Sequence, residues 1–188
     1  MIVGGCRARE CEMGVLIADA MFESVKSQGV QIAIQNGGGI RASLDTGEVT
    51  MGEILTILPF QNTLSTFSVS GATLLAALEN GVSQVAEGAG RFPQVAGLTY
   101  AFDPAGTVGK RISDVRVLHS GRAVPLDPVK LYSVVSNNYL RNGGDGYKMF
   151  KTAQDVYDFG LDLADIVAEY MAAHAPYQPY LAGRIIEK

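Results

Sequence analysis

Three consecutive glycines interrupt the chain at residues 37–39. Glycine loses more conformational freedom on folding than any other residue, so three in a row are unfavourable within a helix or a strand. They indicate instead a turn whose backbone takes unusual dihedral angles or approaches another group closely. Before this turn, residues 10–26 have the apolar spacing of an amphipathic helix, and residues 30–35 are typical of a short buried strand. The glycine turn therefore follows a helix and a strand, and it is the first candidate site.

Helices and strands alternate irregularly along the rest of the chain. A capping-box pattern at Thr50 and Glu53 predicts a short helix that Pro59 ends. Further helices are expected at residues 71–85 and 162–173, strands at 64–69, 98–102, 112–119, 132–135 and 181–186, and a glycine-containing loop at 87–93. No fixed-period repeat is present. This mixture favours an α+β fold over a doubly wound parallel sheet.

Size and composition limit the classes of function. With 188 residues, 47% of them hydrophobic, the chain is long enough for one domain, residues 1–188, with a sizeable core. Its 15 basic and 19 acidic residues give a net charge of −4, without the basic surface of a nucleic-acid-binding protein, so we expect no nucleic-acid partner. No apolar stretch is long enough for a membrane span.

The two cysteines, Cys6 and Cys11, leave two interpretations open. In a continuous helix their Cα atoms would be about 7.5 Å apart along the axis, too far for a disulfide. A disulfide requires that the helix begin after Cys6, which the preceding glycines and the later start of the apolar spacing permit. Two small buried cysteines are about as compatible with the spacing, and a metal site is less so, since His119 and His174 are far away in sequence.

Four segments together resemble the C-terminal domain of the 5'-nucleotidase family, which includes ecto-5'-nucleotidases and periplasmic UDP-sugar hydrolases. They are CRAREC at 6–11, NGGGIR at 36–41, LPF at 58–60 and SNNYLRNGGDGY at 136–147. Their order and spacing make the resemblance specific, and it extends from Cys6 to about Phe150. It implies a layered α/β/β/α domain with mixed sheets that binds a nucleotide or nucleoside. If the domain matures in an oxidising compartment, Cys6 and Cys11 are expected to form a disulfide.

Two arginines have the chemistry for phosphate recognition. Arg7 and Arg41 each offer a planar, permanently charged fork that suits phosphate oxygens. Arg41 follows the glycine turn, where backbone N–H groups of Gly38 and Gly39 could also point at an anion. By resemblance, both arginines match those that bind substrate phosphate. Taken alone, an arginine beside a turn is more often a solvated surface charge.

Two aromatic residues are candidates to hold the base. Phe60 and Tyr139 stand at the ends of predicted elements, where their rings could stack on either face of a base, as the resemblance implies. An isolated aromatic is otherwise usually a core residue. Phe92, in a segment at 90–97 that also matches the family, is a weaker candidate for a wall of the pocket.

Two polar residues are candidates to bind the nucleoside. Glycines flank Asp145, whose carboxylate could therefore be exposed and accept hydrogen bonds from two vicinal hydroxyls of a ribose. Asn36 can both donate and accept, as the edge of a base requires, and the family has an asparagine there against the base. Both residues could instead make Asx turns beside glycine.

The resemblance implies that catalysis needs a second domain. Non-covalent hydrolysis of a phosphate ester usually requires two metal ions held by clustered His, Asp and Asn side chains, and this chain has only two histidines. The family keeps two divalent metals in an N-terminal metallophosphatase domain. We expect that domain to be absent from this chain and to be the chain's partner within the same protein. We therefore expect no cofactor and no catalysis in the chain alone.

The resemblance implies that the whole protein is a 5'-nucleotidase, which hydrolyses nucleoside 5'-phosphates to nucleoside and phosphate. The lack of a hydrophobic tail of the GPI-anchor type after Lys188 favours a periplasmic or secreted location. Within the family, a 2',3'-cyclic phosphodiesterase/3'-nucleotidase or a UDP-sugar hydrolase is an alternative. A stand-alone nucleotide-binding module is an alternative of a different class.

Overall fold

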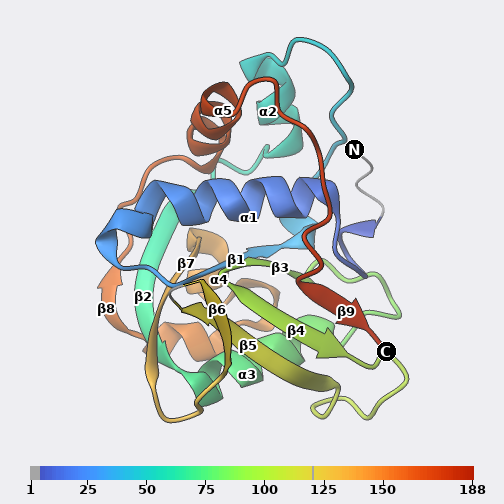
Figure 1. Ribbon diagram of the computed structural model, residues 1–188, viewed down its shortest axis with the longest axis vertical. Coiled ribbons are helices and arrows are strands. Elements are labelled where there is room, and N and C mark those ends of the chain that lie inside the picture. Colours follow the sequence, from blue (N-terminus) through green and yellow to red (C-terminus); the bar gives the residue numbers. More distant parts are fainter. Residues whose placement is uncertain (1–4, 120) are drawn as a thin grey trace.

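The computed structural model describes residues 5–119 and 121–188, and two β-sheets organise them (Figure 1). The five-stranded sheet has the spatial order β3-β1-β7-β2-β8, with β1 at Ile32–Asn36, β2 at Leu64–Ser70, β3 at Pro93–Ala96, β7 at Leu131–Asn137 and β8 at Gln154–Tyr157. The four-stranded sheet has the order β6-β5-β4-β9, with β4 at Leu98–Phe102, β5 at Ile112–His119, β6 at Arg122–Pro125 and β9 at Ile185–Glu187. Each sheet contains one parallel pair, β1 with β7 and β4 with β9, so both are mixed.

Helices complete the layers on either side of the five-stranded sheet. They are α1 (Glu12–Val25), α2 (Met51–Ile57), α3 (Gly71–Val82), α4 (Asn138–Arg141) and α5 (Leu163–Ala173). Helix α1 lies along the sheet, with α2 and α5 on its outer side (Figure 1). The predicted α+β class with mixed sheets is confirmed.

Helix α1 is the centre of the first of two hydrophobic cores. It is buried on nearly all sides, and Met13, Leu16, Ile17 and Met21 are inaccessible to solvent. A helix that is apolar all round needs a partner on each side. Here the five-stranded sheet is one partner and α5 is the other, which places the start of α1 firmly above the ends of β1 and β3.

The second core lies on the opposite face of the five-stranded sheet. It joins that face to α3 and to the four-stranded sheet, and its largest members are aromatic. Phe67 packs against Phe150 with ring centroids 4.9 Å apart, and Phe92 against Phe102 at 5.5 Å. The two cores hold β1 and β7 rigidly between them, because the central strands are buried on both faces.

Most predicted elements are present, but three strands were not predicted. Thr50 and Glu53 form the expected capping box at the start of α2. The edge strands β6 and β8 have every residue exposed, so no alternation of apolar and polar residues marks them. β3 is buried throughout and begins at Pro93, the last residue of the predicted loop. No helix among the described residues has the length and the apolar character needed to cross a membrane.

Candidate functional site

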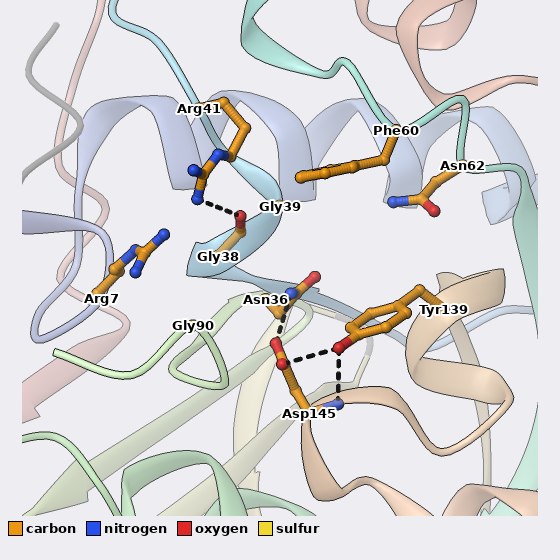
Figure 2. Close-up of a pocket in the computed structure, with 10 residues that line it drawn as sticks. All are labelled: Arg7, Asn36, Gly38, Gly39, Arg41, Phe60, Asn62, Gly90, Tyr139 and Asp145. Atoms are coloured by element: carbon orange, nitrogen blue, oxygen red, sulfur yellow. Dashed lines mark hydrogen bonds between the residues drawn. The ribbon is translucent and has the colours of Figure 1, made fainter. Parts of the chain in front are cut away.

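A pocket of about 490 Å³ opens at one edge of the five-stranded sheet (Figure 2). Its walls come from the disulfide loop, the glycine turn, the loop after α2, the loop before β3, α4 and the turn that follows α4. The lining residues are Arg7, Asn36, Gly38, Gly39, Arg41, Phe60, Asn62, Gly90, Tyr139 and Asp145. All eight residues predicted to bind substrate are among them. Asn62 and Gly90 are the two that the sequence did not single out as binding residues.

The sheet topology explains why distant segments meet here. β1 ends at Asn36 and its parallel neighbour β7 ends at Asn137, so both strands run towards the same edge of the sheet. The glycine turn leaves β1 at that edge, and α4 starts there immediately after β7. Asn137 caps α4 by accepting a 2.9 Å hydrogen bond from the backbone N–H of Leu140. Tyr139, in the first turn of α4, is thereby held at the rim of the pocket.

The glycine turn is required for close approach rather than for unusual dihedral angles. A Cβ on Gly38 would lie 2.6 Å from the Cα of Gly90, and one on Gly37 would collide with the carbonyl of Cys6. The backbone N–H of Gly38 donates a 2.7 Å hydrogen bond to the carbonyl of Gly90. None of the three glycines has a positive φ. The sequence indicated either unusual dihedral angles or close approach to another group, and the structure shows close packing of the glycine backbone.

Phe60 and Tyr139 present their rings across the pocket (Figure 2). Both are substantially exposed, at 55% and 47%, whereas the aromatic side chains of the second core are buried. A Cβ on Gly144 would lie 2.5 Å from the ring of Tyr139, so this glycine lets the backbone support the ring. The core interpretation is wrong for both residues, and the open space between the rings has the form of a stacking site.

Phe92 does not form a wall of the pocket, contrary to the weaker expectation from the sequence. Its side chain is fully buried and packs edge-on against Phe102 in the second core. Gly90 is the residue of that segment that reaches the pocket, because the glycine turn packs directly on its backbone.

Asp145 is held by three polar partners. Its Oδ2 accepts a 2.8 Å hydrogen bond from Asn36 Nδ2, and its Oδ1 accepts a 3.0 Å bond from the Tyr139 hydroxyl. Its carbonyl accepts a 3.1 Å bond from Asn80 Nδ2. The backbone at Asp145 has φ 51°, a left-handed conformation that is uncommon outside glycine. Residues in such strained conformations are often found at functional sites. Burial and the bond to Asp145 raise the pKa of Tyr139, so its hydroxyl remains a donor at neutral pH.

The Asn36 side chain already forms hydrogen bonds within the protein, which the sequence did not suggest. It is 3% exposed, and its Oδ1 accepts a 3.0 Å hydrogen bond from Asn137 Nδ2. Asn137 Nδ2 also donates a 2.8 Å bond to Gln35 Oε1. Since one N–H of Asn36 already bonds Asp145, a single N–H is left over for a ligand. Asn36 thus supports Asp145 and still lines the pocket, and its contact with a base stays a prediction.

Arg7 and Arg41 retain most of their hydrogen-bonding capacity. Arg7 donates to the carbonyl of Gly88 and Arg41 to that of Gly38, each over 3.4 Å. Within residues 5–119 and 121–188, neither guanidinium forms an ion pair with a carboxylate. The guanidinium carbon of Arg41 lies 5.9 Å from the centroid of the Phe60 ring. The pocket thus has uncompensated positive charge at one end, beside the glycine turn (Figure 2).

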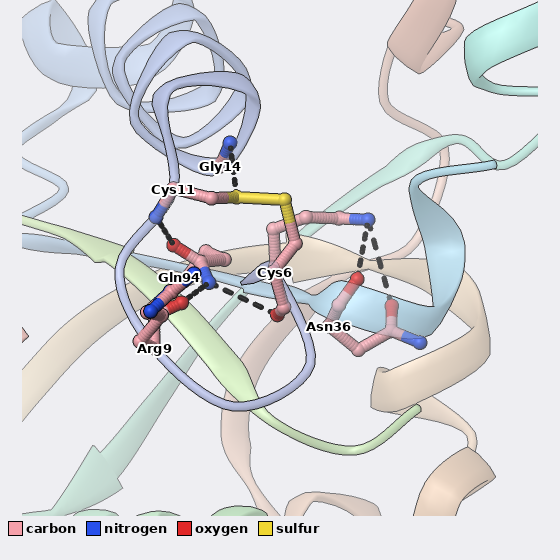
Figure 3. The surroundings of a disulfide bond; sticks show 7 residues. Cys6, Arg9, Cys11, Gly14, Asn36 and Gln94 are labelled. Atoms are coloured by element: carbon pink, nitrogen blue, oxygen red, sulfur yellow. Dashed lines mark hydrogen bonds between the residues drawn. A yellow bond between two sulfur atoms is a disulfide. The ribbon is translucent and has the colours of Figure 1, made fainter. Parts of the chain in front are cut away.

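A disulfide joins Cys6 to Cys11 beside this positive end (Figure 3). The two Cα atoms are 5.1 Å apart, which is possible because α1 begins only at Glu12. Cys11 is the N-cap of α1, and its Sγ accepts a hydrogen bond from the backbone N–H of Gly14. Arg7 belongs to the small loop that the disulfide closes.

The described part of the chain contains no cluster of three or more His, Cys, Asp or Glu side chains placed to hold a metal ion. The ring of His174 stacks on Tyr170, 4.1 Å between centroids, on α5 and away from the lining residues. The absence of catalysis in the chain alone stays a prediction.

Comparisons with known proteins agree on one family. The model of the "5'-nucleotidase, C-terminal domain" family matches residues 2–152. The chain is 39% identical over 184 residues to the trifunctional nucleotide phosphoesterase protein YfkN of Bacillus subtilis. It superposes on the crystal structure of a 5'-nucleotidase precursor from Thermus thermophilus with a TM-score of 0.96 and 44% identity, and on the NAD nucleotidase of Haemophilus influenzae with 0.83 and 31%.

The chain spans only part of each of these proteins. The match covers 96% of the chain but 13% of the Bacillus protein. It covers 99% of the chain and 37% of the Thermus protein, and 94% of the chain and 33% of the Haemophilus protein. The similarity therefore concerns one domain of larger relatives.

Proposed function

The chain belongs to the family of the 5'-nucleotidase C-terminal domain, and from this premise we propose that it is the substrate-recognition domain of a secreted, metal-dependent 5'-nucleotidase. One observation carries the proposal: two exposed aromatic rings, an accessible carboxylate and two arginines without acidic partners line a single pocket. These are the groups that a base, a ribose and a phosphate chain require, and they occur in that order along the pocket.

The nucleoside is held at one end of the pocket. The base stacks between Phe60 and Tyr139, and each ring contributes about 1–3 kcal/mol with little dependence on which base is bound. The ribose hydroxyls donate to Asp145, whose carboxylate the Asn36 and Tyr139 side chains already orient. Asn62, which lies beside the two rings in Figure 2, offers an amide at the edge of the base.

The phosphate groups extend towards the other end of the pocket. Arg7 and Arg41 supply charge-assisted hydrogen bonds, and Gly38 and Gly39 line the pocket beside them. The N–H of Gly38 already bonds the carbonyl of Gly90, so the two arginines carry the phosphate contacts in this proposal. The phosphorus atom that reacts is then presented to a second domain.

Two divalent metal ions and the groups that hold them belong to an N-terminal metallophosphatase domain in this proposal. The described residues of the chain offer no metal-binding cluster, and their part is to bind and orient the substrate. The metal ions, held by the other domain, would supply the activation of water. The chain alone binds nucleotide and does not hydrolyse it. Two observations support a secreted or periplasmic location: the loop at the pocket is closed by a disulfide, and the Thermus relative is described as a precursor.

Related activities are the second candidate. The Bacillus relative is named a trifunctional nucleotide phosphoesterase and the Haemophilus relative an NAD nucleotidase, so similar domains occur in proteins named for different activities. A UDP-sugar hydrolase would use the base and ribose contacts in the same way. A 2',3'-cyclic phosphodiesterase/3'-nucleotidase would share the stacking of the base, but its substrates carry phosphate on the ribose 2' or 3' oxygens and so lack the free diol that Asp145 accepts from. A stand-alone binding module would use them without any catalytic partner.

Calorimetric titration of the chain tests the proposal directly. We expect adenosine, uridine and guanosine to bind with similar affinities, because stacking tolerates different bases, and ADP to bind more tightly than adenosine. Absence of nucleoside binding by the folded chain would refute the proposed pocket. Assaying the full-length protein on 5'-nucleotides, 3'-nucleotides, cyclic nucleotides and UDP-sugars then separates the alternatives.

A further inference from the structure

Gln94 is a buried amide outside the pocket with all of its hydrogen-bonding groups in use. It lies on β3 opposite Gln35 and is 1% exposed. Its Nε2 donates to the carbonyls of Cys6 and Arg9 at 3.0 and 2.7 Å, and its Oε1 accepts a 3.3 Å bond from the N–H of Cys11 (Figure 3). All three partners are backbone groups of the disulfide loop. One side chain therefore spans that loop from beginning to end.

These contacts bracket Arg7. The carbonyl of Cys6 belongs to the peptide bond that joins Cys6 to Arg7, and Arg9, whose carbonyl is the other acceptor, follows Arg7 by two residues. The disulfide fixes the distance between the two ends of the loop, whereas Gln94 fixes the orientation of peptide groups inside it. The same Cys6 carbonyl packs against Gly37, so the orientation of the loop is also matched to the glycine turn.

The neighbouring residues make room for this arrangement. A Cβ on Gly14, in the first turn of α1, would overlap the amide group of Gln94. The first turn of α1 therefore packs directly on the amide. A buried polar side chain needs such partners, since an unsatisfied one is unfavourable by about 1–3 kcal/mol.

We infer that Gln94 is a positioning residue for phosphate recognition, which acts by holding the Cys6–Cys11 loop so that Arg7 faces the pocket. The inference rests on the proposed function, because it takes Arg7 as a phosphate ligand. Among the described residues, the side-chain hydrogen bonds of Gln94 do not reach the side chains that would hold the nucleoside. Its hydrogen bonds end on the loop, while those of Asn36 and Asp145 end on Asn137, Tyr139 and Asn80. The two ends of the pocket are thus supported by separate sets of contacts.

The variant Gln94→Met tests this separation, because methionine has a similar length and removes every hydrogen bond. Calorimetry with adenosine and with ADP is expected to show an unchanged affinity for adenosine and a loss of about tenfold for ADP, no larger than the loss caused by Arg7→Ala. Tyr100→Phe is the matched control. It removes a buried 2.9 Å hydrogen bond to the carbonyl of Pro93, the residue before Gln94, without touching the loop, and both affinities should stay at the parental value.

Gly14→Ala provides a second variant that keeps the Gln94 side chain but displaces it, and it should show the same selective loss if Gln94→Met does not fold. The inference is overturned if either folded variant binds ADP as the parent does, or loses adenosine and ADP affinity by the same factor, as a general destabilisation would produce. If the unmodified chain binds ADP no more tightly than adenosine, the proposed phosphate-binding role of the arginines is refuted. This measurement is made before any Gln94 variant, so it separates a failure of the proposed function from a failure of the inference about Gln94.

Discussion

Asn36 and Asp145 are 109 residues apart in the chain, yet the amide of the first donates a 2.8 Å hydrogen bond to the carboxylate of the second. The other carboxylate oxygen accepts from the Tyr139 hydroxyl. Each oxygen can accept a further bond, so the carboxylate is oriented before a ligand arrives and keeps capacity for two hydroxyls. The arrangement fits a diol, and it makes the contribution of the ribose measurable.

The first prediction separates the ribose from the base. Asp145→Asn should weaken adenosine binding by about 1.5–3 kcal/mol, because a charged acceptor of two hydroxyls is lost. The affinity for 2',3'-dideoxyadenosine, which lacks both hydroxyls, should hardly change. Calorimetry with the two ligands gives the comparison, and Asp165→Asn, on the exposed side of α5, is the control. Equal losses for both ligands would exclude a ribose contact.

The second prediction concerns the aromatic rings. Phe60→Ala and Tyr139→Ala should each weaken nucleoside binding by about 1–3 kcal/mol, whatever base is used, and leucine should restore little because it lacks a flat π face. Tyr139→Phe keeps the ring, so it should retain most of the affinity. Phe159→Ala, which removes an aromatic ring that is 85% exposed elsewhere, is the control. Parental affinity in both alanine variants, with an unchanged circular dichroism spectrum, would rule out stacking.

The third prediction concerns the phosphate groups. Arg41→Ala should leave adenosine binding nearly unchanged and weaken AMP and ADP, since a charge-assisted hydrogen bond contributes about 1.5–3 kcal/mol. Titrations must share one buffer at fixed salt, because screening alters such contacts. Arg122→Ala removes an exposed arginine on β6 and controls for net charge. A loss of adenosine affinity as large as that of ADP would place Arg41 beside the nucleoside instead.

The fourth prediction concerns the disulfide. Protein isolated from an oxidising compartment and unfolded without reductant should contain no titratable thiol, because Cys6 and Cys11 are paired. Two free thiols would contradict the pairing. Replacing both cysteines by serine should lower the free energy of unfolding by at most about 2–4 kcal/mol, since the closed loop is short and constrains little chain entropy. Urea denaturation of the two proteins measures the difference.

The fifth prediction concerns catalysis. Incubated with AMP and Mg²⁺, Mn²⁺, Zn²⁺ or Co²⁺, the chain should release no phosphate, because two metal ions need clustered ligands beside the phosphorus atom. A colorimetric phosphate assay, with the full-length protein as the positive control, makes the comparison. Metal-dependent turnover that survives removal of contaminating phosphatases would reveal a site that the proposal overlooks.

Local sequence signals predicted the parts of the site that depend on local geometry. The glycine turn at 37–39 and the capping box at Thr50 each follow from residues within a few positions of one another. Helix α1 was predicted from Glu10 but begins at Glu12, after Cys11, which is its N-cap. The exposed aromatic rings were predicted only through the family resemblance. Composition alone assigns an isolated Phe60 or Tyr139 to a core.

Long-range polar contacts could not be predicted in the same way. The partners of Gln94 lie 83 to 88 positions away, and the side chain of Asn137 bonds Gln35 across 102 positions. No periodicity or spacing marks such pairs. Asn137 lies beside Gln35 because β7 pairs with β1, and Gln94 lies beside the disulfide loop because α1, which follows that loop, packs on β3. Phe92 illustrates the opposite error, since its motif borders the pocket while its side chain packs into the second core.

The parallel pairing of β1 with β7 has a consequence for biosynthesis. Contacts between segments so far apart in sequence form late and slow the folding of a chain. As the polypeptide leaves the ribosome, Asn36 and the glycine turn emerge long before Asp145, so no nascent intermediate short of that residue has a complete nucleoside site. Under the proposed function, a nucleoside therefore binds and stabilises only chains that extend past Asp145 and have paired β1 with β7, and its binding can report that this step of folding has occurred.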